Sequence, residues 1–207
     1  TTGYDALLRV QQVLTPSVGA AVLDRLWAQA APERGSLDDV VAEAKRLVVD
    51  DVQAAEVDRL MRLVRRILPD LDQGSARRSL EALLVAMDRY RAYVVPGRAV
   101  DPEQAAVIED AAGRARAHLA PTDEPALEVI VDLVLDRELR DAALDTGPLA
   151  DDFRVRFQQT CGPVMAKGIE DTAYYRWFRL AGANEVGGHP DHLSISAEEF
   201  HTWCGRL

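Results

Sequence analysis

Residues 36–68 read "SLDDVVAEAKRLVVDDVQAAEVDRLMRLVRRIL". Apolar side chains recur in this stretch every three or four residues, which places them on one face of an α-helix. Ser36 and Asp39 have the spacing of a capping box, and Pro69 follows the last apolar residue. The stretch therefore predicts one long helix or two helices in line, with an apolar face formed by Val40, Val41, Ala44, Leu47, Val48, Leu60, Met61, Val64, Ile67 and Leu68.

The same spacing predicts helices on both sides of this stretch. Thr15-Pro16 offers a capping hydroxyl before a proline at the first helical position, and Val18, Val22 and Leu26 then repeat as an apolar stripe. Further helices are predicted to begin at Ser75, Asp101, Glu124 and Ser196. The helix from Glu124 is expected to direct inward Leu127, Ile130, Val131, Val134, Leu135 and Leu139. The run Tyr93–Val95 before Pro96-Gly97 is the best strand candidate in the first half.

Composition and charge narrow the function classes. The 207 residues are 48% hydrophobic and 28% charged, which is typical of a globular chain. A formal net charge of −10 disfavours nucleic acid and anionic membranes as partners, because both bind chiefly through basic side chains. Two cysteines and the lack of an apolar run of about 20 residues favour a cytoplasmic protein that does not cross a membrane. The first residues, Thr1–Asp5, have neither a start methionine nor a signal sequence, so we expect a piece of a larger protein.

Chemically distinctive side chains gather beyond residue 150, where 8 of the 12 aromatic residues, 3 of the 4 histidines and both cysteines lie. His189 and His192, with His201 and Cys204, have the pair spacing of a zinc site. A surface histidine pair and a buried Cys204 explain the same residues and are favoured, so we expect no metal and no cofactor. Cys161 is interpreted as a small buried apolar residue rather than a nucleophile.

Residues 167–185 combine aromatic and charged side chains, the two kinds that bind a sugar ring through its apolar faces and its hydroxyls. An aromatic core with paired charges above it explains this composition equally well. The adjacent acids Glu170 and Asp171 point in different directions on a helix or strand, so they are poor candidates for a shared acid/base site. The sugar-binding candidates are Lys167, Glu170, Asp171, Tyr174, Tyr175, Arg176, Trp177, Asn184 and Glu185.

A longer stretch carries a resemblance to a known family. Residues 156–201, "RFQQTCGPVMAKGIEDTAYYRWFRLAGANEVGGHPDHLSISAEEFH", resemble the maltooligosyltrehalose synthases of the α-amylase glycoside hydrolase clan. The shared pattern runs through FQQ, GPVMAKG, EDTA, RL, NEVGG and FH, and the opening "TTGYD" also resembles the family. The chain departs from the pattern at Cys161, at Trp177-Phe178 and at His189.

The resemblance implies an enzyme that isomerises the reducing-end α-1,4 glucosidic bond of a maltooligosaccharide to an α,α-1,1 bond by intramolecular transglucosylation. Such a retaining reaction uses a carboxylate nucleophile and an acid/base carboxyl about 5 Å apart. In the family, these two groups precede the "TTGYD" stretch, and a third essential carboxylate follows the FH helix. None of the three would lie in this sequence, so we predict that the chain alone is inactive.

The resemblance also implies a mainly α fold: a helical insertion subdomain over 1–150, then a segment over 151–207 that returns to a (β/α)₈ barrel and forms part of a sugar-binding wall. Strand-like elements at 93–95 and 164–166 would belong to that barrel, and their unpaired edges favour a non-native dimer of the fragment. Lys167 corresponds to an active-site lysine, and a mutual ion pair of Arg176 with Glu170 is as plausible as sugar contact. The residues implied for substrate binding are Lys167, Glu170, Asp171, Tyr175, Arg176, Asn184 and Glu185. A helical protein-interaction module without catalysis is the alternative.

Overall fold

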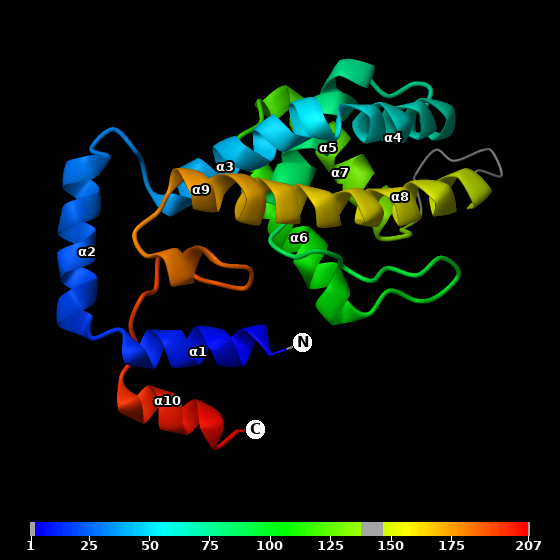
Figure 1. The fold of residues 1–207 in the computed structure, drawn as a ribbon. Helices are drawn as coiled ribbons and strands as arrows, with labels where there is room; N and C mark the ends of the chain where they lie inside the picture. Colours follow the sequence, from blue (N-terminus) through cyan, green and yellow to red (C-terminus); the bar gives the residue numbers. More distant parts are fainter. Residues whose placement is uncertain (1–2, 138–146, 207) are drawn as a thin grey trace. The chain divides into compact units, whose positions relative to one another are not determined.

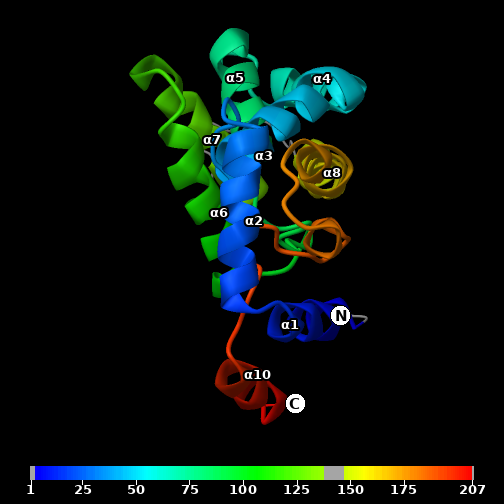
Figure 2. The same ribbon diagram turned by 60° about the vertical axis from the view of Figure 1, so that its left-hand side comes forward.

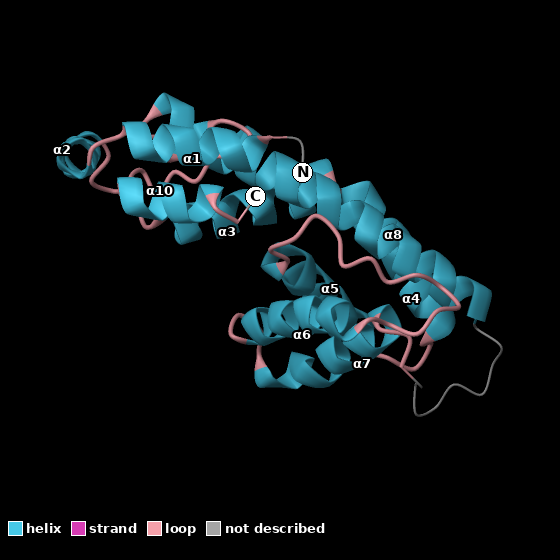
Figure 3. Ribbon diagram, turned by 90° about the horizontal axis from the view of Figure 1, so that it is seen from below, coloured by secondary structure: helices cyan, strands magenta, loops and turns pink. Residues whose placement is uncertain are grey.

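The structure, a computed structural model, describes residues 3–137 and 147–206, and its regular elements in these ranges are all helical (Figures 1 and 3). The predicted mainly α fold is therefore confirmed, while the predicted core residue Leu139 lies outside the described residues. The α-helices are α1 (Tyr4–Leu14), α2 (Ser17–Ala30), α3 (Leu37–Leu47), α4 (Ala54–Ile67), α5 (Gln73–Ala86), α6 (Pro102–Arg116), α7 (Glu124–Val134), α8 (Gly147–Met165), α9 (Tyr174–Arg176) and α10 (Ala197–Cys204). The shorter elements are the π-helices η1 (Val48–Val52) and η3 (Ala166–Ala173) and the 3₁₀-helices η2 (Pro121–Asp123) and η4 (Ala181–Asn184).

The described residues form two compact units. Unit 1 contains residues 3–43 together with 169–206, and unit 2 contains Ala44–Gly168. The predicted boundary at residue 150 divides a helical insertion from a barrel segment of a larger protein. It was not a prediction of two compact units, and it stays a prediction.

Unit 2 holds the larger hydrophobic core. Helix α5 packs against both α6 and α7, and α8 packs along α4 (Figures 1 and 2). Helix α4 supplies Val57, Leu60, Val64 and Ile67, whose spacing is that of one helical face. On α8, Phe153 and Phe157 are completely buried and their rings stack at 6.3 Å. The helix from Glu124 buries its predicted residues up to Leu135.

The sequence predicted either one long helix or two helices over residues 36–68, and the structure has two, α3 and α4. At the start, the Asp39 amide donates to Ser36 Oγ at 3.1 Å and the Ser36 amide donates to Asp39 Oδ2 at 3.0 Å, so the predicted capping box is present. The α-helical pattern changes to the π-helix η1 at Val48, and Gln53 then departs from helical geometry with φ −105°. This irregularity ends the first helix and separates it from α4.

Three further helix starts follow local cap chemistry. Asp101 accepts from the Glu103 amide at 2.8 Å, and Pro102 occupies the first turn of α6. Ser196 and Glu199 form the predicted capping box of α10. The helix predicted from Ser75 begins at Gln73, because the Asp72 carboxylate rather than a serine hydroxyl caps it.

The two predicted strands are wrong, since neither segment forms a strand in the described residues. Tyr93 has φ +48°, a left-handed conformation that an extended strand cannot contain. Val94 instead hydrogen-bonds a side chain: its amide donates to Gln158 Oε1 at 2.9 Å, and Gln158 Nε2 donates to its carbonyl at 2.7 Å. Residues 164–166 are helical, because α8 extends to Met165 and η3 begins at Ala166. Val164 lies on the buried face of α8 together with Phe157. The unpaired strand edges that motivated a dimer are thus absent from the described ranges, and the dimer itself stays a prediction.

In unit 1, α1 lies beside α10 (Figures 1 and 3). Gln12 of α1 is buried, and its Nε2 donates to the His192 carbonyl at 2.7 Å. Helix α2 begins at Ser17 rather than at the proline, because Thr15 Oγ1 donates back to the Gln11 carbonyl and is not available as a cap.

The helix α2 departs from the expected burial. Its predicted apolar stripe of Val18, Val22 and Leu26 is exposed, and none of its residues is buried. Among the described residues, no single helix is long and apolar enough to cross a membrane, although α1 and α2, bent by 93° at their junction, pass a test of length and composition together.

Candidate functional site

The predicted sugar-binding residues lie in the segment that follows α8, which contains the short elements η3, α9 and η4. The chain runs through the π-helix η3 and the single turn α9, and Trp177 then turns to an extended conformation with φ −127°. Pro163 lacks an amide hydrogen inside α8, which weakens regular α-helical bonding just before the π-helix begins. The wider turn of a π-helix is often found at functional sites.

Lys167 is exposed at the start of η3, and its neighbour Gly168 is buried in close contact with Lys45. A Cβ atom added to Gly168 would lie 2.7 Å from Lys45 Cγ and 3.1 Å from Lys45 Cα. Only glycine therefore permits the start of η3 to pack so closely on α3. The last glycine of the GPVMAKG stretch is explained by packing that sets the position of Lys167.

Lys45 is the other of the two lysines in the chain, and it is buried. Its Nζ donates to the Met87 carbonyl at 2.5 Å. Burial lowers the pKa of Lys45 to about 8, and attraction to Asp88 offsets only part of this effect. The buried Cys161 thiol shows the opposite change, since burial raises the pKa of Cys161 to about 12. Its predicted burial is confirmed, and it is protonated at neutral pH.

The low pKa of Lys45 predicts a pH-dependent stability. Below about pH 8 the folded chain holds a buried charge, whereas above this value it releases the proton before the unfolded chain does. The contribution of Lys45 to the free energy of unfolding should therefore rise by about 2 kcal/mol between pH 7 and pH 10. Cys161 acts in the opposite direction over this range, because its thiol ionises only in the unfolded chain.

Comparison with Lys45→Met isolates the lysine contribution, since Cys161 is common to both proteins. The difference in unfolding free energy between wild type and variant is expected to shift in favour of wild type as pH rises. NMR of lysine-labelled protein, which contains only two lysine side chains, gives the pKa of Lys45 directly. Identical pH dependence of the two proteins, or a Lys45 pKa near 10.5, would contradict the prediction.

The predicted sugar-binding residues differ in exposure. Asp171 and Glu185 are exposed, Tyr175 is 79% exposed, and Glu170 is half-buried. An exposed tyrosine ring is available as a platform for the apolar face of a sugar, and exposed carboxylates accept hydrogen bonds from hydroxyls. These four residues, with Lys167, stay predicted contacts.

Two other predicted residues have structural partners. The Asn184 amide donates to the Tyr174 carbonyl at 2.7 Å and to the Trp177 carbonyl at 2.6 Å, which holds η4 against the end of α9. Arg176 Nη1 lies 3.5 Å from Glu43 Oε1, a partner that the sequence did not suggest. Asn184 therefore braces the segment, and Arg176 is oriented by an ion pair on α3.

The two glycines that follow Val186 are required by close contacts. Gly187 has φ +75°, and a Cβ on Gly188 would lie 2.2 Å from the Ala183 carbonyl oxygen. The Tyr174 hydroxyl donates to the Gly188 carbonyl at 3.0 Å, and burial followed by the nearby Glu170 raises the pKa of Tyr174. The NEVGG stretch thus forms a tight turn that is tied to α9.

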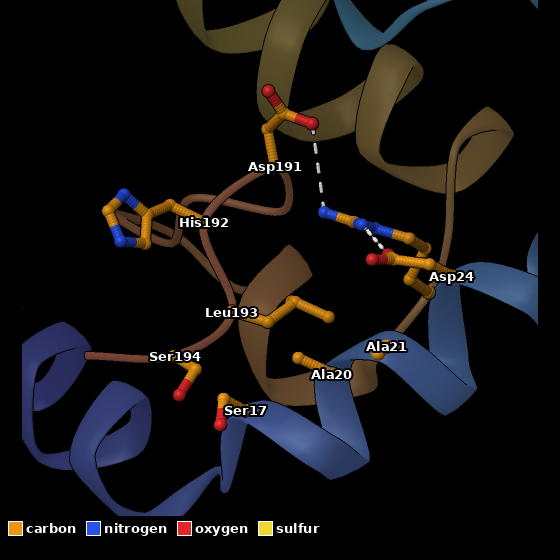
Figure 4. A pocket seen from close by; sticks show the side chains of 9 residues that line it. Ser17, Ala20, Ala21, Asp24, Asp191, His192, Leu193 and Ser194 are labelled. Carbon is orange, nitrogen blue, oxygen red and sulfur yellow. Dashed lines mark hydrogen bonds and ion pairs between the residues drawn. The ribbon is translucent and has the colours of Figure 1, made fainter. Parts of the chain in front are cut away.

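A polar cleft of about 250 Å³ lies beside α2 (Figure 4). The loop carrying Asp191 to Ser194 faces the Ser17 to Asp24 flank of α2 across it. Arg179 joins the two sides, because its guanidinium pairs with Asp24 and lies 3.7 Å from Asp191. Its Cζ also lies 4.5 Å above the Trp177 ring, and the Trp177 ring is 5.8 Å from that of Trp27.

Desolvation lowers the pKa of Arg179, whose side chain is only 9% exposed. Sequence reasoning did not assign Arg179, Asp24 or Asp191 to a site, because the two acids come from distant segments. The arginine of the RL pair was the one available signal. With its Nη groups already engaged and its Nε sealed from solvent, Arg179 clamps the loop to α2 rather than offering a free group to a ligand.

The zinc alternative finds no geometric support in the described residues, where no group of three or more His, Cys, Asp or Glu side chains is placed to hold a metal ion. His189 and His192 are exposed with ring centroids 6.3 Å apart. The expectation of a buried Cys204 is wrong, since this residue is exposed. Phe200 and Trp203 of α10 are only half-buried, which leaves Cys204 at the surface.

Comparisons with known proteins extend the family resemblance. No protein-family model matches the chain. Over 201 residues, the chain is 31% identical to "Putative maltooligosyl trehalose synthase" of Mycobacterium tuberculosis (strain H37Rv), a match that covers 97% of this chain and 23% of that protein. The solved maltooligosyltrehalose synthase from Arthrobacter ramosus matches with a TM-score of 0.78 and 31% identity over 100% of this chain and 24% of its own. A structure named DSM5389 glycosyltrehalose synthase matches with a TM-score of 0.64 and 25% identity over 98% of this chain and 22% of its own.

Both solved structures match this chain over nearly its whole length, each through one portion of its own chain. This chain is homologous to one portion of the maltooligosyltrehalose synthases, and the resemblance inferred from the sequence is confirmed. The chain spans about a quarter of the length of the relatives it matches.

Proposed function

We propose that this chain is part of an enzyme that isomerises the reducing-end α-1,4 glucosidic bond of maltooligosaccharides to an α,α-1,1 bond. One observation carries the proposal: the correspondence with the Arthrobacter ramosus synthase, at 31% identity and a TM-score of 0.78, extends over the whole chain. This correspondence favours the enzyme over a helical interaction module. The nucleophile and acid/base carboxylates are assigned to polypeptide outside this segment, within a (β/α)₈ barrel.

The part of this chain in the reaction is to hold sugar. Lys167 is an exposed residue next to Gly168, which packs closely on Lys45, and its ammonium suits a charge-assisted hydrogen bond to a glucose hydroxyl. The released glucose must remain bound while it turns over, so groups that grip its hydroxyls without hydrolysing the intermediate are required. Tyr175 supplies an exposed ring for an apolar sugar face.

An activity assay of the intact synthase that carries this segment tests the proposal. Maltopentaose should lose its reducing end as the trehalose linkage forms, whereas the isolated chain should leave it unchanged. Lys167→Ala is expected to lower kcat/KM about 10- to 100-fold, the loss that corresponds to one hydrogen bond to a charged group. Arg59→Ala, at an exposed ion pair on α4, serves as the control and should retain activity.

Two results would overturn the proposal. Trehalose-end formation by the isolated chain would show that the essential carboxylates lie within it. An intact wild-type synthase that produces only free glucose and shorter maltooligosaccharides would make the enzyme a hydrolase.

A further inference from the structure

The first two helices expose an apolar stripe that the proposed function does not use. Its large aliphatic side chains recur every three or four residues through α1 and α2, and each is between 39% and 76% exposed. We call these residues the α1–α2 stripe: Leu7, Val10, Leu14, Val18, Val22 and Leu26.

The stripe is distinct from the flank of α2 that already has contacts. Trp27 packs on Trp177, and Asp24 pairs with Arg179. Val22 lies about 140° around the helix axis from Trp27, because successive residues of an α-helix are separated by about 100°. The stripe residues of α2 therefore point away from the contacts that hold α2 in unit 1.

With its apolar face exposed, helix α2 gains little stability from burial. Isolated helices of about this length are marginal in water, and helices in proteins are stabilised chiefly by burying an apolar face. Helix α2 has no buried residue, although its sequence is predominantly apolar. On α2, Val18, Val22 and Leu26 follow one another at a spacing of four residues, and an exposed apolar helix face of this kind marks an interaction site.

We propose that the α1–α2 stripe docks on the remaining part of the synthase polypeptide, an inference that rests on the proposed function. The Arthrobacter ramosus synthase that this chain matches with a TM-score of 0.78 has about three quarters of its length outside the matched portion. That remainder is large enough to cover the stripe in the same molecule. The covering surface must be aliphatic and uncharged, since Val18, Val22 and Leu26 would leave any charged group facing them without a partner.

Charge substitutions distinguish a covered stripe from an exposed one. In the intact synthase, Val22→Lys and Leu26→Lys are each expected to lower Tm by about 5 °C or more, or to abolish soluble protein, because a buried unpaired ammonium is strongly unfavourable. Ala28→Lys, at an exposed position of the same helix outside the stripe, should shift Tm by less than about 2 °C. In the isolated chain, all three variants should have similar Tm values, since all three positions are exposed there.

Each alternative occupant gives a different result that would overturn the proposal. If a second copy covers the stripe, the intact synthase is a dimer by light scattering and Val22→Lys makes it a monomer. If lipid covers it, the intact wild-type synthase floats with neutral phosphatidylcholine vesicles and its Val22→Lys variant does not. Equal Tm values for Val22→Lys and Ala28→Lys in the intact synthase would show that the stripe is uncovered. Failure of the proposed function is read separately, from the product that the wild-type synthase makes from maltopentaose.

Discussion

Replacing Arg154 by alanine is expected to lower the free energy of unfolding by about 3–5 kcal/mol, chiefly through the cavity and the buried carbonyl that loses its donor. Arg154 of α8 is almost completely buried, and its guanidinium contacts Asp136 Oδ1 at 2.5 Å and Asp151 Oδ1 at 2.6 Å. Its Nε also donates to the Leu133 carbonyl at 2.9 Å, at the end of α7. Removing the side chain leaves a cavity, two carboxylates without their cation and a carbonyl without its donor.

Urea denaturation followed by circular dichroism measures this loss. Arg156→Ala is the matched control on the same helix, because Arg156 pairs with Asp152 at a more exposed site and should cost less than about 1 kcal/mol. Arg154→Lys should recover only part of the loss, since an ammonium cannot serve three acceptors in the fork geometry of a guanidinium. Equal losses for Arg154→Ala and Arg156→Ala would mean that burial of the ion pair adds nothing to stability.

Features that depend on residues close together in the sequence were predictable. The capping boxes at Ser36 and Ser196 and the Asp101-Pro102 start satisfy amides within the same helical turn, so neighbouring residues are sufficient to specify them. Apolar periodicity likewise identified the buried faces of α4 and α7. Helix α4 buries its face against α5 and α8, and α7 buries its face against α5, α6 and α8, so both faces form part of the core of unit 2.

Features that depend on distant partners were not predictable. A lysine side chain usually keeps its charged end in water, yet the Met87 carbonyl, 42 residues away, accepts a hydrogen bond from the buried Lys45. Periodicity marked Val18, Val22 and Leu26 as an apolar face without showing what covers it. Arg179 shows the same limit at the candidate site, because Asp24 and Asp191 flank it from segments that are far apart in the sequence.

The family resemblance supplied what periodicity could not. The stretch 156–201 identified the synthases, but it did not separate residues that touch sugar from those that build the segment. The structure assigns building roles to Gly168, Asn184 and Gly188 through close contacts and backbone hydrogen bonds. A motif records both kinds of constraint together, so only coordinates distinguish them.

Gln158→Leu is expected to cost about 2–4 kcal/mol, the second-largest effect. The run at 93–95 has the β-branched composition of a strand, and Val94 is buried with both of its backbone groups needing partners. Gln158 provides both from α8, at 2.9 Å to the amide and 2.7 Å to the carbonyl, as a neighbouring strand would. Leucine has similar volume but no polar group, so two buried backbone groups lose their hydrogen bonds at about 1–3 kcal/mol each.

Amide hydrogen exchange separates this mechanism from a general loss of stability. In Gln158→Leu, the Val94 amide should exchange at least about tenfold faster than can be explained by the change in global unfolding, because the loop opens locally once its tether is removed. Gln159→Leu, at the adjacent exposed position, should change neither Val94 exchange nor stability beyond about 0.5 kcal/mol. If Val94 remains equally protected in Gln158→Leu, its packing against the core holds the loop in place, and the side-chain amide of Gln158 is not the substitute for a strand neighbour.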